Sequence, residues 1–318
     1  MKKAAQFLRG NYILIFALVF AIVPLILRNN YYIYVMNRGF ANGIAVLGLV
    51  ILYGIGGQIS LGHVAFFAIG AYTSAILSLT YHVPVYFSIL IGIFFSCLFG
   101  VLLSIPAFKL SGPFLAISTV AFGEIIRIII LNAESLTGGP YGLNKIPDLS
   151  LFGITIKEDI HWYYLLLLVA VLFAVIGIRL KRSHIGRALY AIKDDEIAAE
   201  VMGINIRSMK RLAFVNAAFF AGTSGALYAH FSGFLGAELV AQDVSFNLFS
   251  MAVLGGTDSI VGGVWSGMAL TIAPEAMRFL QEYYIMILNL MVLLVVLVPW
   301  TKVIDSIKEK YSAKSKVV

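Results

Sequence analysis

Two ionisable residues stand inside one of the most apolar stretches of this sequence. The stretch is LAISTVAFGEIIRIII, residues 115–130, and it contains Glu124 and Arg127 three positions apart. On a helix this spacing puts both side chains on one face, where they can form an ion pair. Charged groups within a membrane segment are candidates for function because burying them unpaired is costly. Two interpretations stay open: a polar wall of a substrate pathway, or a structural ion pair that fixes helix packing.

Two hydroxyl residues, Ser118 and Thr119, lie one to two turns before this pair. In one interpretation they face the same pathway as Glu124 and Arg127. In the other they donate hydrogen bonds to their own helix, as hydroxyls in membrane helices often do. All four residues are therefore candidates for a substrate pathway.

A second cluster of charge fills residues 181–211, in the middle of an otherwise apolar chain. It holds four acids and seven bases, the bases being Lys181, Arg182, Arg187, Lys193, Arg207, Lys210 and Arg211. Loops rich in lysine and arginine favour the cytoplasmic side of a membrane. The cluster is therefore predicted to be the main cytoplasmic loop.

The order of residues in this loop predicts a short helix, about 195–202. Asp194 is a suitable N-cap, and the carboxylates of Asp195 and Glu196 suit the positive end of a helix. Gly203 can close the helix in a left-handed conformation. Because a helix of two turns is marginal in water, we expect it to dock against another surface. That surface is a partner protein or, alternatively, its own bundle or the lipid interface.

The apolar and acidic residues of this short helix are predicted on different sides. Ile197 and Val201 are four residues apart and share one side, while Glu196 and Glu200 share the other. An acidic side is unfavourable against anionic lipid. This argues for a protein surface rather than the lipid interface.

Motifs for nucleotide, metal or nucleophile chemistry are absent from the sequence. It has no Gly-Lys pair and hence no G-x-x-x-x-G-K-[ST] loop for ATP phosphates. The single cysteine is Cys97, and the five histidines are scattered over different segments: His63, His82, His161, His184 and His230. A disulfide framework and a metal cluster are therefore not expected. We expect a protein without enzymatic activity, and with no cofactor of its own.

The composition is that of an integral membrane protein. Of the 318 residues, 60% are hydrophobic and 12% are charged, against about 25% charged in ordinary soluble domains. A soluble chain this apolar would expose large apolar patches and aggregate. The net charge of +7 does not indicate nucleic-acid binding, because the bases lie at the chain ends and in one loop.

Apolar runs of membrane-spanning length, about 17–25 residues, recur along the chain. They are predicted at 12–27, 39–56, 63–80, 85–107, 114–132, 162–180, 212–231 and 284–300. Two shorter runs flank GGTDSIVGG within 245–274, where we predict two short helices. The predicted fold is an all-α, polytopic integral membrane helical bundle. We expect about ten transmembrane segments, within a range of eight to ten. We expect residues 1–318 to form a single transmembrane domain.

The distribution of bases predicts the orientation. The basic N-terminus resembles a signal peptide, but no cleavage site follows, so we expect a retained first helix. With both termini cytoplasmic, sixteen of the 23 bases lie inside and five outside. This arrangement makes residues 133–161 an external loop and residues 302–318 a basic cytoplasmic tail.

Four stretches of the sequence resemble the permease subunits of bacterial branched-chain amino acid ABC transporters. They are GQISLGHVAFFAIGAYTSA (57–75), AFGEIIRIIILNAESLTGGPYGLNKIP (121–147), GRALYAIKDDEIAAEVMGINIRSMKRLAFVNAAFFAGTSGALYA (186–229) and VLGGTDSIVGGVWSG (253–267). They occur in order over most of the chain. They resemble the LivM-type subunit more than its LivH-type partner, and they are more specific for the family than for a substrate.

The resemblance implies a function and a set of partners. The chain would form half of the pathway by which leucine, isoleucine, valine or similar apolar amino acids enter across the bacterial plasma membrane. The other components would be a LivH-type permease, an extracytoplasmic substrate-binding protein and two ATP-binding subunits. ATP and Mg²⁺ would be held by those ATPase subunits.

The resemblance also implies a role for the predicted short helix. In such importers a cytoplasmic coupling helix that ends at a glycine rests in a cleft of the ATPase subunit. The matching positions here are Glu196, Ala198, Ala199 and Gly203. The match to the family's Glu-Ala-Ala motif is loose, because Ile197 interrupts it.

Two other functions stay open. Urea-type permeases share these motifs, so an importer of urea or amides is an alternative. An ion-coupled secondary amino acid transporter is a further one. It would require a relay of buried acids, and Glu124, if paired with Arg127, makes a poor relay.

Overall fold

The computed structural model describes residues 17–24, 29–151 and 154–277, and the single residues 283, 286, 287, 290, 293 and 294. The chain divides into two units, Met1–Ile272 and Ala273–Val318. The longer helices are α2 (Asn30–Leu49), α3 (Val64–Leu79), α4 (Val85–Ala107), α5 (Gly112–Asn132), α7 (Asp159–Arg182), α8 (His184–Asp194), α10 (Ile206–Ser232), α11 (Gln242–Leu254) and α12 (Ile260–Ala276). In the second unit, the Met277 N–H donates to the Ala273 carbonyl at 2.8 Å.

The described part of the chain contains five helices long and apolar enough to cross a membrane. They are Asn30–Ile55, Val85–Ala107, Gly112–Asn132, Asp159–Arg182 and Ile206–Ser232, and Val64–Leu79 is a shorter apolar helix. The predicted all-α class is confirmed. The count of about ten segments and the cytoplasmic placement of both termini stay predictions, and the predicted helix 284–300 lies outside the described residues apart from the single residues given above.

Several helices begin earlier in the structure than the sequence predicts. The run predicted at 39–56 starts at Asn30, because the Asn29 side chain accepts a hydrogen bond from the Tyr31 N–H at 2.9 Å. The run predicted at 212–231 starts at Ile206, where Asn205 is the N-cap. In both cases a polar cap extends the helix beyond its apolar stretch. The two short helices predicted within 245–274 are confirmed as α11 and α12.

Helix α10 lies at the centre of the first unit. It packs against α2, α3 and α4, and small residues bring the backbones close together. A Cβ atom added at Gly225 would overlap the Phe67 carbonyl of α3. Serine hydroxyls bridge the helices here, since Ser96 Oγ donates to the Phe66 and Ala218 carbonyls at 3.0 and 2.9 Å. By contrast, most residues of α5 are exposed or partly exposed.

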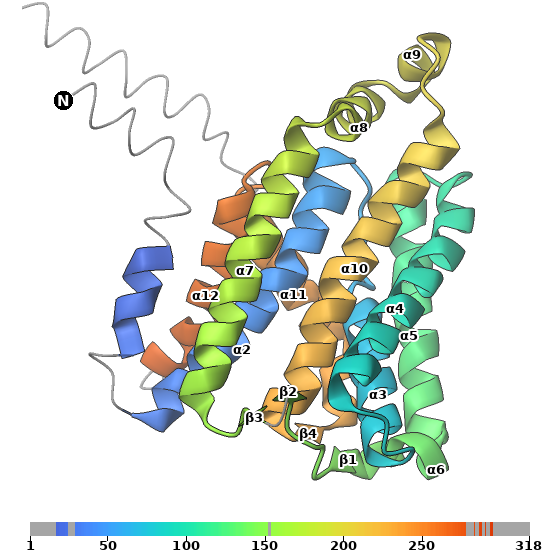
Figure 1. Ribbon diagram of the computed structural model, residues 1–318. Helices are drawn as coiled ribbons and strands as arrows, with labels where there is room; N and C mark the ends of the chain where they lie inside the picture. Colours follow the sequence, from blue (N-terminus) through green and yellow to red (C-terminus); the bar gives the residue numbers. More distant parts are fainter. Residues whose placement is uncertain are drawn as a thin grey trace, which may run out of the picture. The chain divides into compact units, whose positions relative to one another are not determined.

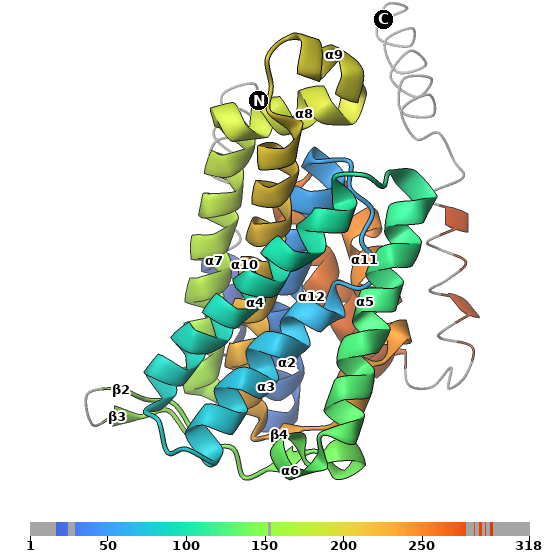
Figure 2. The same cartoon turned by 90° about the vertical axis from the view of Figure 1, so that its right-hand side faces the viewer.

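Residues 56–63, which precede α3, enter the bundle without being helical. Helix α2 continues into a π-helix, η1 (Val50–Ile55), and residues 56–63 then run back along the bundle and join α3 part-way down it (Figure 2). Side chains of distant elements satisfy both backbone groups of Leu61 in this segment. The Thr119 hydroxyl accepts from the Leu61 N–H at 3.0 Å, and Gln242 Nε2 donates to the Leu61 carbonyl at 2.9 Å.

Short elements close one end of the bundle (Figure 1). They are α6 (Glu134–Thr137), η2 (Gly139–Tyr141), β1 (Leu143–Asn144), β2 (Ser150–Leu151), β3 (Ile154–Thr155), β4 (Phe234–Leu235) and η3 (Ala237–Val240). Strand β1 pairs antiparallel with β4, and β2 with β3. We call this the strand end. The predicted external loop 133–161 forms most of it.

Candidate functional site

Helices α8 and α9 lie at the opposite end from the strands (Figures 1 and 2). The predicted short helix is α9 (Glu196–Val201), and Gly203 follows it with a φ of +84°. The predicted N-cap, Asp194, is wrong. Asp194 ends α8, and the cap is Asp195, whose Oδ1 accepts from the Ala198 N–H at 3.0 Å. The apolar residues of α8 recur at helical spacing up to Ile192, so the sequence pattern does not reveal that the helix is interrupted at residue 195.

One side of α9 is fixed to the bundle by a small apolar cluster and an ion pair. Ala199 is buried against Ile192 of α8 and Ile206 of α10. Lys210 of α10 is 2% exposed, and its Nζ lies 2.8 Å from Glu196 Oε1. The same ammonium donates to the Ala107 carbonyl at the end of α4, at 3.3 Å. Glu196 and Ala199 thus face the bundle.

Apolar side chains of α9 point away from the bundle, with Glu200 exposed beside them. Ile197, Val201 and Met202 are 78%, 81% and 81% exposed. The predicted separation of Ile197 and Val201 from Glu196 is present, but the apolar side is the free one. Grouped apolar side chains this exposed are typical of a binding surface, so α9 rests on its own bundle with one side and leaves the other free to bind.

Helix α8 links α9 to two other parts of the bundle. Lys193 Nζ donates to the Gly54 carbonyl of η1 at 2.7 Å. The Tyr190 hydroxyl donates to Asp258, in the turn between α11 and α12. A displacement of α9 would therefore reach η1 and α12 through side chains of α8.

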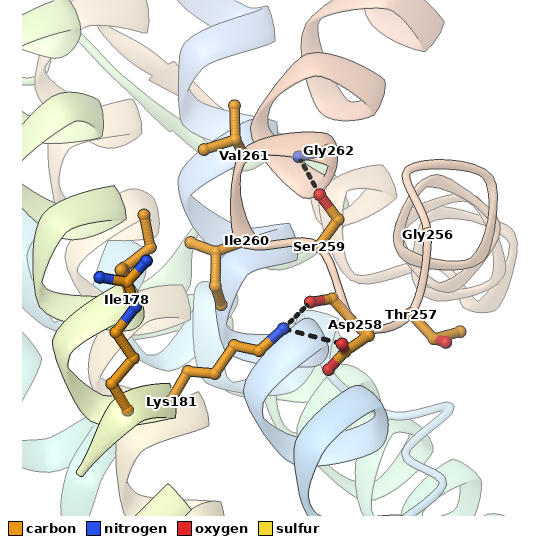
Figure 3. Close-up of a pocket in the computed structure, with 10 residues that line it drawn as sticks. Ile178, Lys181, Gly256, Thr257, Asp258, Ser259, Ile260, Val261 and Gly262 are labelled. Atoms are coloured by element: carbon orange, nitrogen blue, oxygen red, sulfur yellow. Dashed lines mark hydrogen bonds and ion pairs between the residues drawn. The ribbon is translucent and has the colours of Figure 1, made fainter. Parts of the chain in front are cut away.

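The turn that holds Asp258 also binds the end of α7. Lys181 Nζ lies 2.8 Å from Asp258 Oδ2 and donates to the Asp258 carbonyl at 2.5 Å. Figure 3 shows both contacts. A cavity of about 590 Å³ lies beside the turn, lined by Ile178, Lys181, Arg182 and residues 256–262. Partial burial raises the pKa of Asp258, but hydrogen bonds from Lys181 and Tyr190 and the Lys181 charge outweigh it, so the pKa falls below its ordinary value.

Glu124 and Arg127 form the ion pair that their spacing predicts. Arg127 Nη2 lies 2.9 Å from Glu124 Oε1, and Arg127 Nε donates to both carboxylate oxygens. Both side chains are more than a third exposed on α5. The pair therefore lies on a helix face that the described part of this chain does not cover.

The two hydroxyl residues of α5 do not join that pair. Thr119 is fully buried, donates to the Ala116 carbonyl at 2.7 Å and accepts from the Leu61 N–H. It thus bonds to its own helix and also holds the non-helical segment 56–63. Ser118 is partly exposed and lies about 120–180° around the helix from Glu124 and Arg127. A helix rotates by about 100° per residue, so adjacent positions cannot share one face.

Sequence reasoning missed the importance of Lys210, which it treated only as one base of a cytoplasmic loop. A signal was available. Lys210 follows Ile206 by four residues and precedes Phe214 by four, so it stands on the buried stripe of α10. A lysine at such a position requires a partner. Its partner Glu196 lies on the neighbouring short helix.

Known proteins resemble this chain along most of its length. A family model described as branched-chain amino acid transport system / permease component matches residues 31–297. The high-affinity branched-chain amino acid transport system permease protein LivM of Escherichia coli (strain K12) is 35% identical over 274 residues, which is 79% of this chain and 64% of that protein. LivM of Salmonella typhimurium gives the same identity and coverage. LivH of Salmonella typhimurium is 26% identical over 82% of this chain and 90% of its own length.

The LivM relatives are longer than the matched region, since this chain spans 64% of their length. No solved structure matches the chain significantly. The family model nevertheless covers well over half of the chain, and five described helices are long and apolar enough to cross a membrane. This chain is therefore a multi-pass membrane protein that belongs to the family of branched-chain amino acid transport system permease components.

Proposed function

We propose that this chain is the LivM-type permease subunit of an ATP-binding cassette importer for branched-chain amino acids. In this proposal it forms half of the pathway across the bacterial inner membrane, and it is not an enzyme. A LivH-type permease, two ATP-binding subunits and an extracytoplasmic binding protein complete the assembly. ATP and Mg²⁺ are held by the ATP-binding subunits.

The observation that carries this proposal is the exposed apolar side of α9. Ile197, Val201 and Met202 project from a helix whose other side is fixed by the Glu196–Lys210 ion pair. Such a helix presents a fixed apolar surface to a cleft of a partner protein. Because the helix is already held in place, it loses little conformational entropy on binding. This supports α9 as the coupling helix that meets an ATPase subunit.

The four residues assigned to coupling then have different tasks. Glu196 and Ala199 fix α9 to the bundle, so they act through its position. Ala198 is exposed and lets the ATPase surface approach closely. Gly203 reverses the chain at a positive φ, which favours glycine.

The contacts of α8 support a route from the ATPase to the membrane part. When ATP binding displaces α9, Lys193 transmits the motion to η1 and Tyr190 transmits it to the turn before α12. Because η1 leads into the non-helical segment 56–63, the motion reaches the interior of the bundle. The switch between outward- and inward-facing states is proposed to follow this route.

The exposed ion pair on α5 suits a pathway between two permeases. Glu124 and Arg127 are paired on a face that the described residues leave uncovered, so a partner permease can lie opposite them. We therefore assign Glu124 and Arg127 to the wall of the substrate pathway, whereas Ser118 lies on another side of α5. Thr119 contributes by holding segment 56–63 in place.

The test is ATP-driven leucine uptake by the complete complex in proteoliposomes. A carboxylate at position 201 would be desolvated in the ATPase cleft, which costs more than about 1.4 kcal/mol. We therefore expect Val201→Asp to lower uptake and substrate-stimulated ATP hydrolysis by at least about tenfold. Gly203→Pro is expected to have the same effect, because proline cannot adopt the positive φ at this position.

The matched control is Val201→Leu, which keeps the apolar side and is expected to retain uptake. Membrane insertion of every variant is measured in parallel. Normal substrate-stimulated ATP hydrolysis by both Val201→Asp and Gly203→Pro complexes would refute the coupling role. Uptake driven by an ion gradient, with this chain alone, would instead support a secondary transporter, and competition by urea would support the urea-type alternative.

A further inference from the structure

A second cavity, of about 390 Å³, carries charges of both signs and an apolar wall. Residues from α2, α3, α10, η3 and α11 line it, and Phe234 of β4 places it toward the strand end. Its volume is within the range of small-ligand sites, about 300–1,000 Å³. Under the predicted orientation, the strand end faces the outside of the cell.

Arg38 supplies the positive charge of this cavity. It lies eight residues into α2, about 12 Å along the helix from Asn30 at 1.5 Å per residue. The side chain is exposed, and no ion pair to it is found among the described residues. A cation within a membrane span is expected to meet a counter-charge or to serve a ligand.

The start of α3 lies on the same cavity. Val64, the first residue of that helix, lines it together with Phe67 one turn later. The helix begins inside the bundle because residues 56–63 are not helical. The positive end of its dipole lines the same cavity as Arg38, and both favour a carboxylate there.

Two acids supply the negative charge. Glu238 lies in η3 and Asp243 lies in the first turn of α11. Both are exposed, and within the residues that the structure describes neither has an ion pair. They line the cavity with Arg38 but do not neutralise it directly, so a ligand bearing both charges can bridge them.

The rest of the wall is apolar. Leu239, Val244 and Leu248 line the cavity beside Phe67, and Leu248 is buried. An apolar wall cannot form hydrogen bonds with urea or another neutral polar molecule, so such a ligand would have unpaired polar groups in this cavity. A branched aliphatic side chain gains free energy by leaving water for this surface.

We infer that this cavity binds a zwitterionic α-amino acid with an apolar side chain on its way through the permease. The substrate carboxylate meets Arg38 and the start of α3, the ammonium group meets Glu238 and Asp243, and the side chain lies on the Leu239–Leu248 wall. This inference rests on the proposed function, because it names the contacts of the transported substrate within this chain.

The experiment uses a leucine analogue with a photoreactive diazirine in its side chain, applied to the purified complex without ATP or binding protein. After illumination, mass spectrometry locates the labelled residues. We expect labelling near Phe67, Leu239 and Leu248, protection by excess leucine, and no protection by urea. Neither leucinamide, which lacks the carboxylate, nor 4-methylpentanoate, which lacks the ammonium group, is expected to protect at the same concentration.

Charge variants test the assignment of each end. Arg38→Gln removes the charge-assisted hydrogen bond to the substrate carboxylate and is expected to lower labelling and leucine uptake by at least about tenfold. Arg38→Lys is expected to restore part of both, and Glu238→Gln with Asp243→Asn to lower both. The control Lys109→Gln removes an exposed cation elsewhere and is expected to change neither.

The outcomes separate this inference from the proposed function. Labelling outside the cavity, or labelling that Arg38→Gln leaves unchanged, overturns the cavity assignment even when the wild-type complex imports leucine with ATP. Protection by urea equal to that by leucine also overturns it. Cavity labelling that depends on Arg38, in a complex without ATP-driven uptake, supports the site and refutes the proposed importer.

Discussion

The ion pair between Glu196 and Lys210 leads to a prediction about how firmly α9 is held. Replacing the carboxylate by an amide, Glu196→Gln, keeps the shape of the side chain and removes its charge. Lys210 is 2% exposed in the structure, and the Ala107 carbonyl at 3.3 Å is the other acceptor of its ammonium group. The substitution therefore leaves a buried cation without its counter-ion.

The structure sets the size of the effect. Removing one partner of a fully buried pair costs about 3–5 kcal/mol. The Glu196 side chain is 40% exposed, so solvent screens the pair and water can reach the site once α9 loosens. We therefore expect the local stability of α9 to fall by about 1–3 kcal/mol, which is about a 5- to 150-fold change in its opening equilibrium.

Hydrogen exchange of the α9 backbone amides measures this opening. The Met202 N–H donates to the Ala198 carbonyl and the Gly203 N–H to the Glu200 carbonyl, both within the helix and its closing turn. In the full-length chain in nanodiscs, without the ATPase, exchange in residues 196–204 is expected to be about 5- to 150-fold faster for Glu196→Gln. Amides in the centre of α10 are the internal control.

A second substitution makes the reasoning refutable. Lys210→Met replaces the buried cation by an apolar chain of similar length and leaves only the half-exposed carboxylate, which water can solvate. It is expected to cost less than Glu196→Gln, and the double variant is expected to resemble Lys210→Met. Wild-type exchange rates in Glu196→Gln, or purely additive effects in the double variant, would show that the ion pair does not hold α9.

Three further predictions concern the bundle. Thr119→Val removes the acceptor for the Leu61 N–H and is expected to cost about 1–3 kcal/mol of stability, whereas Ser118→Ala is expected to be nearly neutral; thermal denaturation of the purified chain compares them. Gly225→Ala forces α10 away from the Phe67 carbonyl and is expected to lower the yield of folded protein on size-exclusion chromatography, a result that wild-type yield would contradict. The pKa of Asp258 is lowered in the folded chain, so the ionised carboxylate contributes fully to stability above the ordinary pKa near 3.8. This contribution is lost as the pH falls through the lowered pKa. The stability difference between wild type and Asp258→Asn, about 0–1 kcal/mol at neutral pH, is therefore expected to vanish at that low pH.

The sequence alone predicted the membrane class, most helices and the short helix closed by Gly203. These features depend on local physics. Apolar runs of sufficient length report burial in lipid or protein, and Gly203 reports the end of a helix, whereas the cap at the start proved to be Asp195 and not the predicted Asp194. The Glu124–Arg127 pair was predictable for the same reason, since its two members are one turn apart on one helix.

The tertiary structure decided which sides of these elements are used. Segment 56–63 enters the bundle because Thr119 and Gln242, 58 and 181 residues from Leu61, satisfy its backbone. The apolar side of α9 is free because Lys210 holds Glu196 from another helix. Arg38, Glu238 and Asp243 line one cavity only when α2, η3 and α11 are packed together. Local patterns specify helices and their ends, but contacts between distant residues depend on how the helices pack, and periodicity does not encode that packing.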